Sequence, residues 1–316
     1  MSSQTAKGKA FEYATLISIY NRLSSIQNVS IENNESFNIA KNFYDNLTDL
    51  QRIEMDRAAT AGIRLIERVE PQLQNPDSNS SLILSIQPDS AGVNGDVRDV
   101  ICMRMSNGWE IGISCKHNHD AVKHSRLSPS IDFGQKWFNK PCSNQYFTDI
   151  NLVFDTLRTY MNSQMTFNDI PDKAGEVYYP IMMAFIEEIR RLDAMFPGQI
   201  AEDFIRYLLG RNDFYKVISN SNETTSVQIF NMNGTLNRPS QTVRPLFRIP
   251  ALNFPSRIFD IRFSPGSQNT CVITFDNGWA VSFRIHNART LVETSLKFDV
   301  KLVGIPSTLT TFVEQW

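Results

Sequence analysis

Two side chains of opposite charge, Asp99 and Lys116, flank an Asn-Gly pair in the stretch GDVRDVICMRMSNGWEIGISCKHNHDAVKHSR at residues 95–126. A carboxylate can hold a divalent cation against a scissile phosphate. A lysine can orient or deprotonate the attacking water and offset negative charge in the transition state. If the fold brings these two side chains together, their chemistry is that of metal-dependent phosphodiester hydrolysis.

The runs on either side of the Asn-Gly pair alternate in character, which predicts a β-hairpin because both residues tolerate positive φ angles. We expect strands at 97–105 and 109–116, joined by a two-residue turn. In that register Asp99 faces Lys116 across the strands, with Cβ atoms about 5 Å apart. The hairpin alone favours a plainer interpretation, an edge hairpin with one surface ion pair, because such turns and such pairs are common.

The position two residues before the lysine holds a serine. Nucleases of the PD-(D/E)xK class carry an acid there, whereas this chain reads Ser114-Cys115-Lys116. Glu110 is a poor replacement, because six residues along a strand span roughly 20 Å. The pattern therefore lacks its usual second acid.

The 316-residue chain has the composition of a soluble globular protein, with 41% hydrophobic and 20% charged residues. Its start lacks the apolar segment of a signal peptide, and no apolar run approaches the roughly 20 residues that span a membrane. We therefore expect no membrane association and a cytoplasmic location, with four reduced thiols at Cys102, Cys115, Cys142 and Cys271.

The net charge of −2 argues against non-specific nucleic-acid binding, which depends on a basic surface. Basic residues are nevertheless concentrated after the predicted hairpin, at Lys116, Lys123, Arg126, Lys136 and Lys140, together with His117, His119 and His124. The aromatic stretch FGQKWFNKPCSNQYF follows, and it forms either an irregular wall of the core or a surface that touches nucleic acid.

Hydrophobic periodicity predicts helices at 9–23, in two pieces across 35–73, and at 151–163, 176–195 and 198–218. Thr48 and Gln51 fit a capping box that opens the second of the two pieces. From residue 224 onward the pattern changes to the period of strands. Glu12 shares the apolar stripe of the first helix, so its carboxylate needs a cation, a metal or donors, unless it reaches water at the end of the stripe.

Two further acids precede the hairpin. Pro88-Asp89 opens a Gly-bearing loop, and turn formation explains it better than catalysis does. Asp96 lies three residues before Asp99, where it is either a second ligand or the end of the loop. The run Cys115-Lys116-His117-Asn118-His119 is a poor zinc site, because neighbouring side chains of a strand face opposite ways and no CxxC pair is present. It also spells HNH, which keeps ββα-metal nuclease chemistry as an alternative.

Three strings resemble the HaeIII-type restriction endonucleases: KGKAFEYA at 7–14, QPDSAGVNGDVRDVI at 87–101 and IGISCKHNHDAVKHSRLS at 111–128. The resemblance implies a Type II restriction enzyme that cuts double-stranded DNA at GGCC with Mg²⁺. It also implies an α/β (α+β) fold with a PD-(D/E)xK-like core, a mixed sheet flanked by helices. We expect three parts: a nuclease core with N-terminal helices at 1–150, a helical segment at 151–223, and a β-rich part at 224–316 that contributes to DNA recognition.

The resemblance also suggests roles for individual residues. Related nucleases can carry a catalytic glutamate on the first helix in a Gly-x-x-x-Glu context, which Glu12 fits. Asp99 is then the principal metal ligand, Lys116 the catalytic lysine and Glu12 the supplementary acid. The Cys115 carbonyl is a further candidate ligand, and Asp96 is held in reserve.

The expected DNA contacts are His117, His119, Lys123, His124, Arg126 and Arg284. Arginines suited to read guanine in the major groove are Arg126, Arg244, Arg248, Arg257, Arg262 and Arg284, most of which we expect to contact phosphate or to be structural. A palindromic site is compatible with a homodimer or with two sequential cuts. Two alternatives stay open, a repair or junction nuclease on the same core and a non-catalytic DNA-binding protein on a degenerate nuclease fold.

Overall fold

The computed structural model describes residues 3–75, 79–93, 95–118, 122–123 and 125–316. The chain forms two compact units, the first made of residues 1–120, 210–252 and 308–316 and the second of residues 121–209 and 253–307. Each unit takes segments from all three predicted parts of the sequence, and the division into 1–150, 151–223 and 224–316 stays a prediction. No helix in the described part of the chain is both long and apolar enough to cross a membrane.

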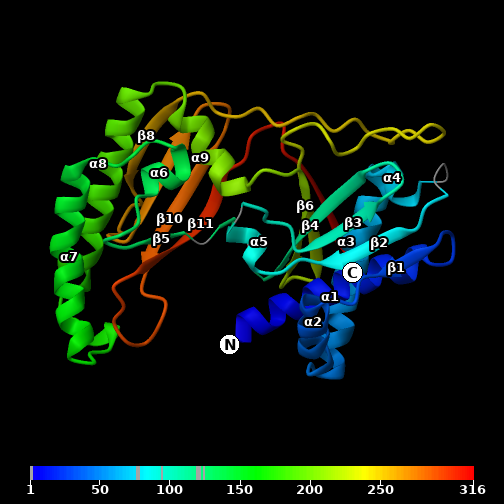
Figure 1. The fold of residues 1–316 in the computed structure, drawn as a ribbon, viewed down its shortest axis with the longest axis horizontal. Helices are drawn as coiled ribbons and strands as arrows, with labels where there is room; N and C mark the ends of the chain where they lie inside the picture. The colour runs from blue at the N-terminus through cyan, green and yellow to red at the C-terminus, as the bar shows by residue number, and fades with distance from the viewer. Residues whose placement is uncertain (1–2, 76–78, 94, 119–121, 124) are drawn as a thin grey trace. The chain divides into compact units, whose positions relative to one another are not determined.

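The first unit is built on a mixed seven-stranded sheet (Figure 1). Its strands, in spatial order, are β1 (Val29–Ile31), β2 (Leu82–Ile86), β3 (Val100–Arg104), β4 (Trp109–His117), β6 (Phe214–Asn220), β7 (Thr224–Phe230) and β12 (Thr310–Gln315). The pairs β1–β2 and β4–β6 are parallel and the others are antiparallel. This sheet confirms the predicted α+β class with a mixed central sheet.

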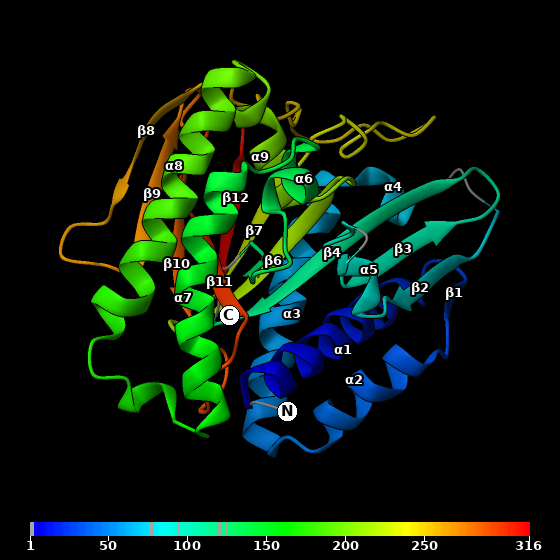
Figure 2. The same ribbon diagram turned by 60° about the vertical axis from the view of Figure 1, so that its left-hand side comes forward.

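Helices of the first unit cover the sheet through a shared apolar core. They are α1 (Ser3–Leu23), α2 (Glu35–Asp45), α3 (Asp49–Val69) and α4 (Pro71–Gln74), and the short helix α5 (Ser90–Val93) follows β2 in the chain. α1 packs on β2, β3 and β4, α3 packs on β6 and β7, and α2 packs against α1 (Figure 2). The predicted capping box is confirmed, since the Thr48 side chain accepts from the Gln51 backbone and the Gln51 side chain accepts from the Thr48 backbone.

The hairpin register differs from the prediction by two residues. Val100 pairs with Ile113 and Arg104 with Trp109, so Asp99 lies opposite Ser114 rather than Lys116. The cause is the turn, which spans residues 105–108, with positive φ at Gly108 (65°) but not at Asn107. The Asn107 side chain instead accepts from the Trp109 backbone at 3.0 Å, an arrangement typical of Asx turns.

The predicted helix at 198–218 is wrong in its second half. α9 covers Ile200–Leu209 and ends at Gly210, whose φ of 85° favours glycine. A Cβ at Gly210 would lie 2.4 Å from the carbonyl oxygen of Gly95. The following residues form strand β6, and its aromatic and β-branched residues favour a strand.

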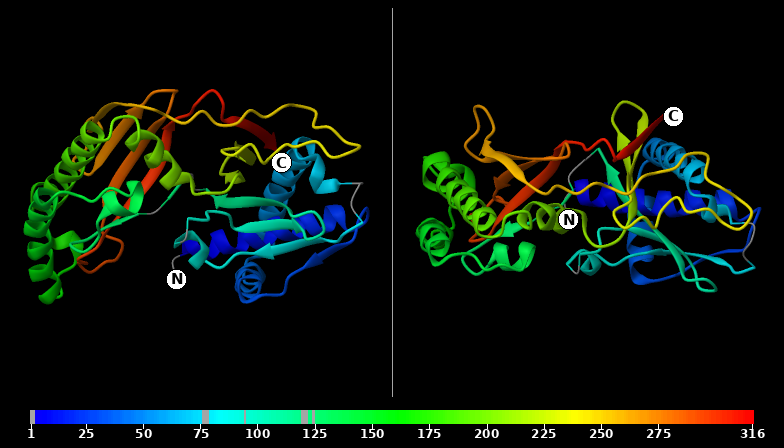
Figure 3. Two further views of the ribbon diagram at one scale, coloured as in Figure 1. Left: turned by 45° about the horizontal axis from the view of Figure 1, so that its top comes forward. Right: turned by 90° about the horizontal axis from the view of Figure 1, so that it is seen from above.

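The second unit carries a five-stranded antiparallel sheet in the order β5 (Arg126–Leu127), β11 (Leu296–Gly304), β10 (Ala280–His286), β9 (Thr270–Phe275) and β8 (Ile258–Phe263). Its helices are α6 (Phe133–Phe138), α7 (Asn144–Asn162), α8 (Tyr179–Met195) and α9, with a 3-10 turn η1 (Phe167–Asp169) and a π-helical turn η2 (Ala174–Tyr178). α7 and α8 lie side by side (Figure 3). Phe133, Trp137 and Tyr146 are buried, so most of the aromatic stretch belongs to the core.

A buried carboxyl group links α3 and α4 to the segment after β7. Glu70 is fully buried, and it accepts hydrogen bonds from the Tyr215 hydroxyl at 2.9 Å and the Asn237 backbone at 2.8 Å. Burial raises its pKa from 4.5 to about 7, and the donors only partly oppose this effect. The folded state therefore keeps a proton that the unfolded chain releases, so this contribution to stability is complete below pH 4.5 and is lost as the pH rises through about 7.

We predict that Glu70→Gln removes this pH dependence. The fall in the free energy of unfolding between about pH 5 and about pH 7.5, measured by urea denaturation, should be roughly 2 kcal/mol smaller than in wild type. Glu54→Gln, an exposed substitution on the same helix α3, serves as the control and should follow wild type. A Glu70→Gln variant with the wild-type pH dependence would contradict the assignment.

Candidate active site

Strand β4 separates an apolar face from a polar face. Ile111, Ile113 and Cys115 point into the core beneath α1 and α3. Ser114 and Lys116 alternate with them and point the other way, as predicted. The opposite strand β3 begins after Asp99, which lies on the same polar face as Ser114.

The carboxylate of Asp99 is held by the main chain of β4 and by Lys116. Its Oδ2 accepts from the Cys115 backbone at 2.6 Å and from the Ser114 hydroxyl at 3.2 Å, and the Lys116 ammonium lies 3.3 Å away. The Asp99 and Lys116 side chains are 23% and 24% exposed, so both can be reached from solvent. The predicted pair is therefore formed, although it runs diagonally across the strands.

Glu12 of α1 is buried within the electrostatic range of this pair. Its Oε2 lies 3.0 Å from the Lys9 ammonium one turn earlier in α1. Burial, and then the negative charge of Asp99, raise the pKa of Glu12 to about 8, while the ammonium groups of Lys9 and Lys116 oppose the rise. The structure thus brings Asp99, Lys116 and Glu12 together.

Asp89 is linked to Glu12 through an ion pair that both carboxylates make with Lys9. The Lys9 ammonium lies 2.5 Å from the Asp89 carboxylate as well as 3.0 Å from Glu12. Backbone hydrogen bonds from Ala91 to Pro88 and from Gly92 to Asp89 confirm the turn that the sequence predicts. The contact between Asp89 and Lys9 was not predicted from the sequence. The Pro88-Asp89 pair was the only sequence feature that pointed to Asp89.

Lys216 is a second residue that the sequence analysis missed. It lies on β6 directly beside Ser114 in the parallel pair, so its side chain shares the face of Asp99 and Lys116. Lys216 is only 3% exposed. Its place on a strand beside β4 was not predicted, because residues up to 218 were expected to be helical.

Asp96 contacts a different set of residues. Arg98 binds both of its oxygens at 2.7 Å, and the Gln87 and Asn212 side chains donate at 3.1 and 3.2 Å. Burial favours the neutral acid, but these donors outweigh it and lower the pKa of Asp96. The Arg98 side chain crosses Gly112, where a Cβ would lie 2.0 Å from its Cδ. Asp96 therefore has Arg98, not Lys116, as its cationic partner.

The side chain of Cys115 lies in the core, and burial raises the pKa of its thiol well above the ordinary value. A thiolate is therefore disfavoured there. Only the main chain of Cys115 contacts the Asp99–Lys116 pair, through the hydrogen bond from its amide to Asp99. Its carbonyl stays a candidate ligand.

His117 is half-buried at the end of β4. Its ring centroid lies 6.1 Å from that of Phe11, and its Nε2 lies 3.2 Å from the Asn118 amide nitrogen. Burial lowers its pKa below 6.5, so the ring is neutral near pH 7 and attracts phosphate weakly. His119 and His124, which were also predicted to contact DNA, lie outside the described residues.

The other predicted DNA contacts, Lys123, Arg126 and Arg284, lie in the second unit and have protein partners. The Lys123 ammonium donates to the Tyr207 carbonyl at 2.7 Å and lies 3.7 Å from the centroid of its ring, and burial lowers its pKa to about 8. Arg126 and Arg284 form ion pairs at 3.9 and 2.7 Å. Because these three side chains already have protein partners, less of their positive charge is available to a phosphate. Their contact with DNA stays a prediction.

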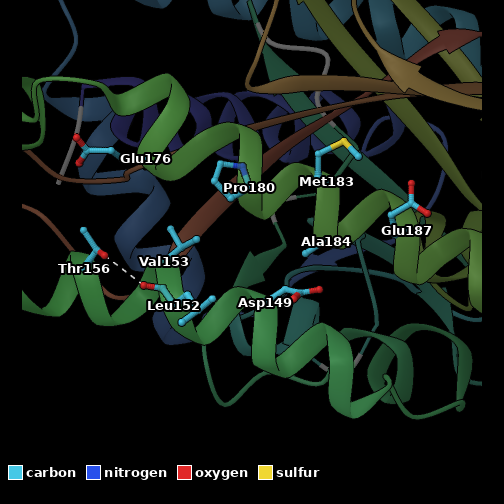
Figure 4. A pocket seen from close by; sticks show the side chains of 9 residues that line it. All are labelled: Asp149, Leu152, Val153, Thr156, Glu176, Pro180, Met183, Ala184 and Glu187. Carbon is cyan, nitrogen blue, oxygen red and sulfur yellow. Dashed lines mark hydrogen bonds between the residues drawn. The ribbon is translucent and has the colours of Figure 1, made fainter.

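A pocket of about 660 Å³ lies between α7 and α8 in the second unit (Figure 4). It is lined by Asp149, Leu152, Val153, Thr156, Glu176, Pro180, Met183, Ala184 and Glu187. The carboxylates accept from neighbouring side chains, Asp149 from Gln145, Glu176 from Tyr160 and Glu187 from Arg190. Three acids and no base disfavour a phosphate ligand, so this pocket does not match the predicted chemistry.

A mixed sheet flanked by helices, with an acid directly before β3 and a lysine on the adjacent strand β4, is consistent with a nuclease-like α+β core. The chain matches the family model of the HaeIII restriction endonuclease over residues 8–306, and it belongs to that family. It is 42% identical over 310 residues to the Type II restriction enzyme HaeIII of Haemophilus aegyptius, an alignment that covers 98% of this chain and 97% of the relative. No solved structure gives a significant match. The resemblance seen in the first 130 residues is thus confirmed across nearly the whole chain.

The coupling between Asp99 and Glu12 gives a prediction that does not depend on activity. Asp99→Asn should lower the pKa of Glu12 from about 8, because it removes the negative charge that helps to raise it. Carbon-13 NMR titration of protein labelled at the glutamate carboxyl groups measures this pKa, with the resonance assigned by Glu12→Gln.

Asp96→Asn is the matched control, because it removes an equal charge that is paired with Arg98. It should leave the Glu12 titration near that of wild type. The same Glu12 titration curve in Asp99→Asn and Asp96→Asn would contradict the geometry described above.

Proposed function

We propose that this protein is a Type II restriction endonuclease that hydrolyses phosphodiester bonds of double-stranded DNA at GGCC. The reaction centre is the group of Asp99, Glu12 and Lys116. One observation carries the proposal: in a member of the HaeIII restriction endonuclease family, a lysine ammonium lies 3.3 Å from a carboxylate at the ends of two adjacent strands. Family membership supports the cleavage of DNA at a fixed sequence. The choice of GGCC is what the resemblance to the HaeIII-type enzymes implies.

The residues present fit Mg²⁺ as the cofactor. Enzymes that act on phosphate esters bind this ion through one or two carboxylates together with substrate phosphate and water. Asp99 and Glu12 would hold it, with the Cys115 carbonyl as a third candidate. Among the described residues no group of three or more His, Cys, Asp or Glu side chains could hold a metal, so substrate phosphate and water would have to supply the other ligands.

The state of Glu12 supports this assignment. A carboxyl group with a pKa of about 8 is protonated near pH 7, here because of burial first and the negative charge of Asp99 second. A bound divalent cation would oppose both effects and favour the carboxylate. The bound ion would supply polarisation of the phosphate and compensation of its negative charge.

Lys116 contributes a fixed positive charge. Burial opposes this charge, but the negative charge of Asp99 and the hydrogen bond to its carboxylate outweigh burial and raise the pKa of the ammonium. Lys116 therefore stays protonated, which favours orientation of water and stabilisation of the transition-state charge over proton abstraction. Asp99 in turn fixes the position of the ammonium through their contact.

The oligomeric state and the cellular location are further expectations. A palindromic site is compatible with a homodimer or with two sequential cuts by a single copy, and the homodimer and the cytoplasmic location stay predictions. The repair or junction nuclease and the non-catalytic DNA-binding protein are separated from this proposal by the two experiments that follow.

We predict that Lys116→Ala lowers the rate of Mg²⁺-dependent duplex cleavage by at least about 100-fold, because it removes charge stabilisation in the transition state. Binding to the same duplex, measured by fluorescence anisotropy with Ca²⁺ in place of Mg²⁺, should survive. Lys41→Ala, at an exposed lysine that pairs with Asp45 on α2, is the control and should cleave like wild type. Cleavage by Lys116→Ala within a few-fold of wild type would remove this residue from the mechanism.

We also predict that digestion of a sequenced plasmid with Mg²⁺ gives one fixed set of fragments whose ends map to GGCC. The mapped ends report activity, specificity and cut position together. Cuts at branched or damaged sites alone would favour the repair nuclease, and binding without any cuts would favour the non-catalytic protein. Cuts at a different short sequence would keep the restriction enzyme and reject GGCC.

A further inference from the structure

The segment between β7 and β8 contains an irregular arm that belongs to the first unit, residues 231–252 (yellow in Figure 3). Its sequence, NMNGTLNRPSQTVRPLFRIPAL, has three arginines and no acidic residue. In a chain of net charge −2, such a stretch is a local concentration of positive charge.

The two ends of the arm are tied together and to the body of the unit. The Asn231 carbonyl accepts from the Leu252 backbone at 2.9 Å, and the Asn237 side chain accepts from the Ile249 backbone at 2.8 Å. The Asn237 backbone in turn donates to the buried Glu70. The arm is therefore held at its base by polar contacts rather than by a regular ladder.

The tip of the arm is closed on itself and is largely exposed. The Ser240 backbone donates to the Val243 carbonyl at 2.9 Å, which makes a tight turn. Phe247 stays in contact with β12 through Phe312, with ring centroids 6.1 Å apart. These contacts fix the tip relative to the sheet of its own unit, so the entropy lost on binding a partner is reduced.

Three exposed arginines of the arm, Arg238, Arg244 and Arg248, line one hollow of about 600 Å³. No ion pair of these three side chains is found in the part of the chain that the structure describes. Some exposed arginines elsewhere, such as Arg206 and Arg158, pair with carboxylates on their own helices. Three guanidinium groups around one hollow without a carboxylate match a polyanion.

We infer that the arm at 231–252 binds the sugar-phosphate backbone of duplex DNA, with Arg238, Arg244 and Arg248 contacting phosphates. This inference rests on the proposed function. The sequence analysis named Arg244 and Arg248 only as single candidates, whereas the arm brings them together with Arg238. Contacts to phosphate fix the position and orientation of a duplex but carry no sequence information directly. The arm therefore contributes affinity, while the choice of site depends on other residues.

The test is the salt dependence of binding to two duplexes of equal length, one with GGCC and one without, in Ca²⁺. The triple variant Arg238→Gln, Arg244→Gln and Arg248→Gln should weaken both by a similar factor. It should also reduce the slope of log K against log salt concentration by about 0.9 per lost phosphate contact, so by about 2.7 if each arginine meets one phosphate. Its cut position in Mg²⁺ should be unchanged.

Arg158→Gln on α7 is the control, because Arg158 is exposed but paired with Asp155, and it should keep the wild-type slope. A triple variant with the wild-type slope would overturn the inference, and loss of discrimination between the duplexes would show base reading instead. Changed sedimentation of the free triple variant would also overturn it, because it would assign the arm to contact between copies of the chain. If wild type neither binds nor cuts duplex DNA, the proposed function itself fails.

Discussion

The position of the Asp99 carboxylate depends on the register of two antiparallel strands. Asp99 lies opposite Ser114, and its Oδ2 accepts a hydrogen bond from the Cys115 amide at 2.6 Å. Lys116 lies two residues after Ser114 on the same face of β4, and its ammonium contacts the same oxygen. A slip by one residue would turn Lys116 into the core and bring Cys115 to the polar face, so the buried face of β4 enforces the register and with it the pair.

The serine at position 114 is consistent with this electrostatic arrangement. An acid there would add a third carboxylate beside Asp99 and near Glu12, which already has a pKa of about 8 because of burial and the charge of Asp99. Ser114 instead donates a hydrogen bond to Asp99 at 3.2 Å. Under the proposed function, Glu12 of helix α1 supplies the acid that the strand lacks. Lys9 is a second cation beside Glu12.

The sequence predicted those features that depend on local pattern. The apolar alternation of β4 and the core-facing Glu12 followed from period and spacing, and a mixed sheet flanked by helices followed from the family resemblance. The register of the hairpin was wrong because it depends on the φ angle of Asn107, which composition does not fix. Asp89 was assigned only to a turn and Lys216 to a helix, because their contacts with Lys9 and Ser114 join elements far apart in the chain.

The most direct test of the reaction centre is a crystal structure of the protein bound to a GGCC duplex in the presence of Ca²⁺, which supports binding without rapid turnover. We expect the scissile phosphate beside the Lys116 ammonium and the cation between the carboxylates of Asp99 and Glu12. A scissile phosphate and cation held by other residues, with Asp99 and Lys116 still bound only to each other, would contradict this expectation.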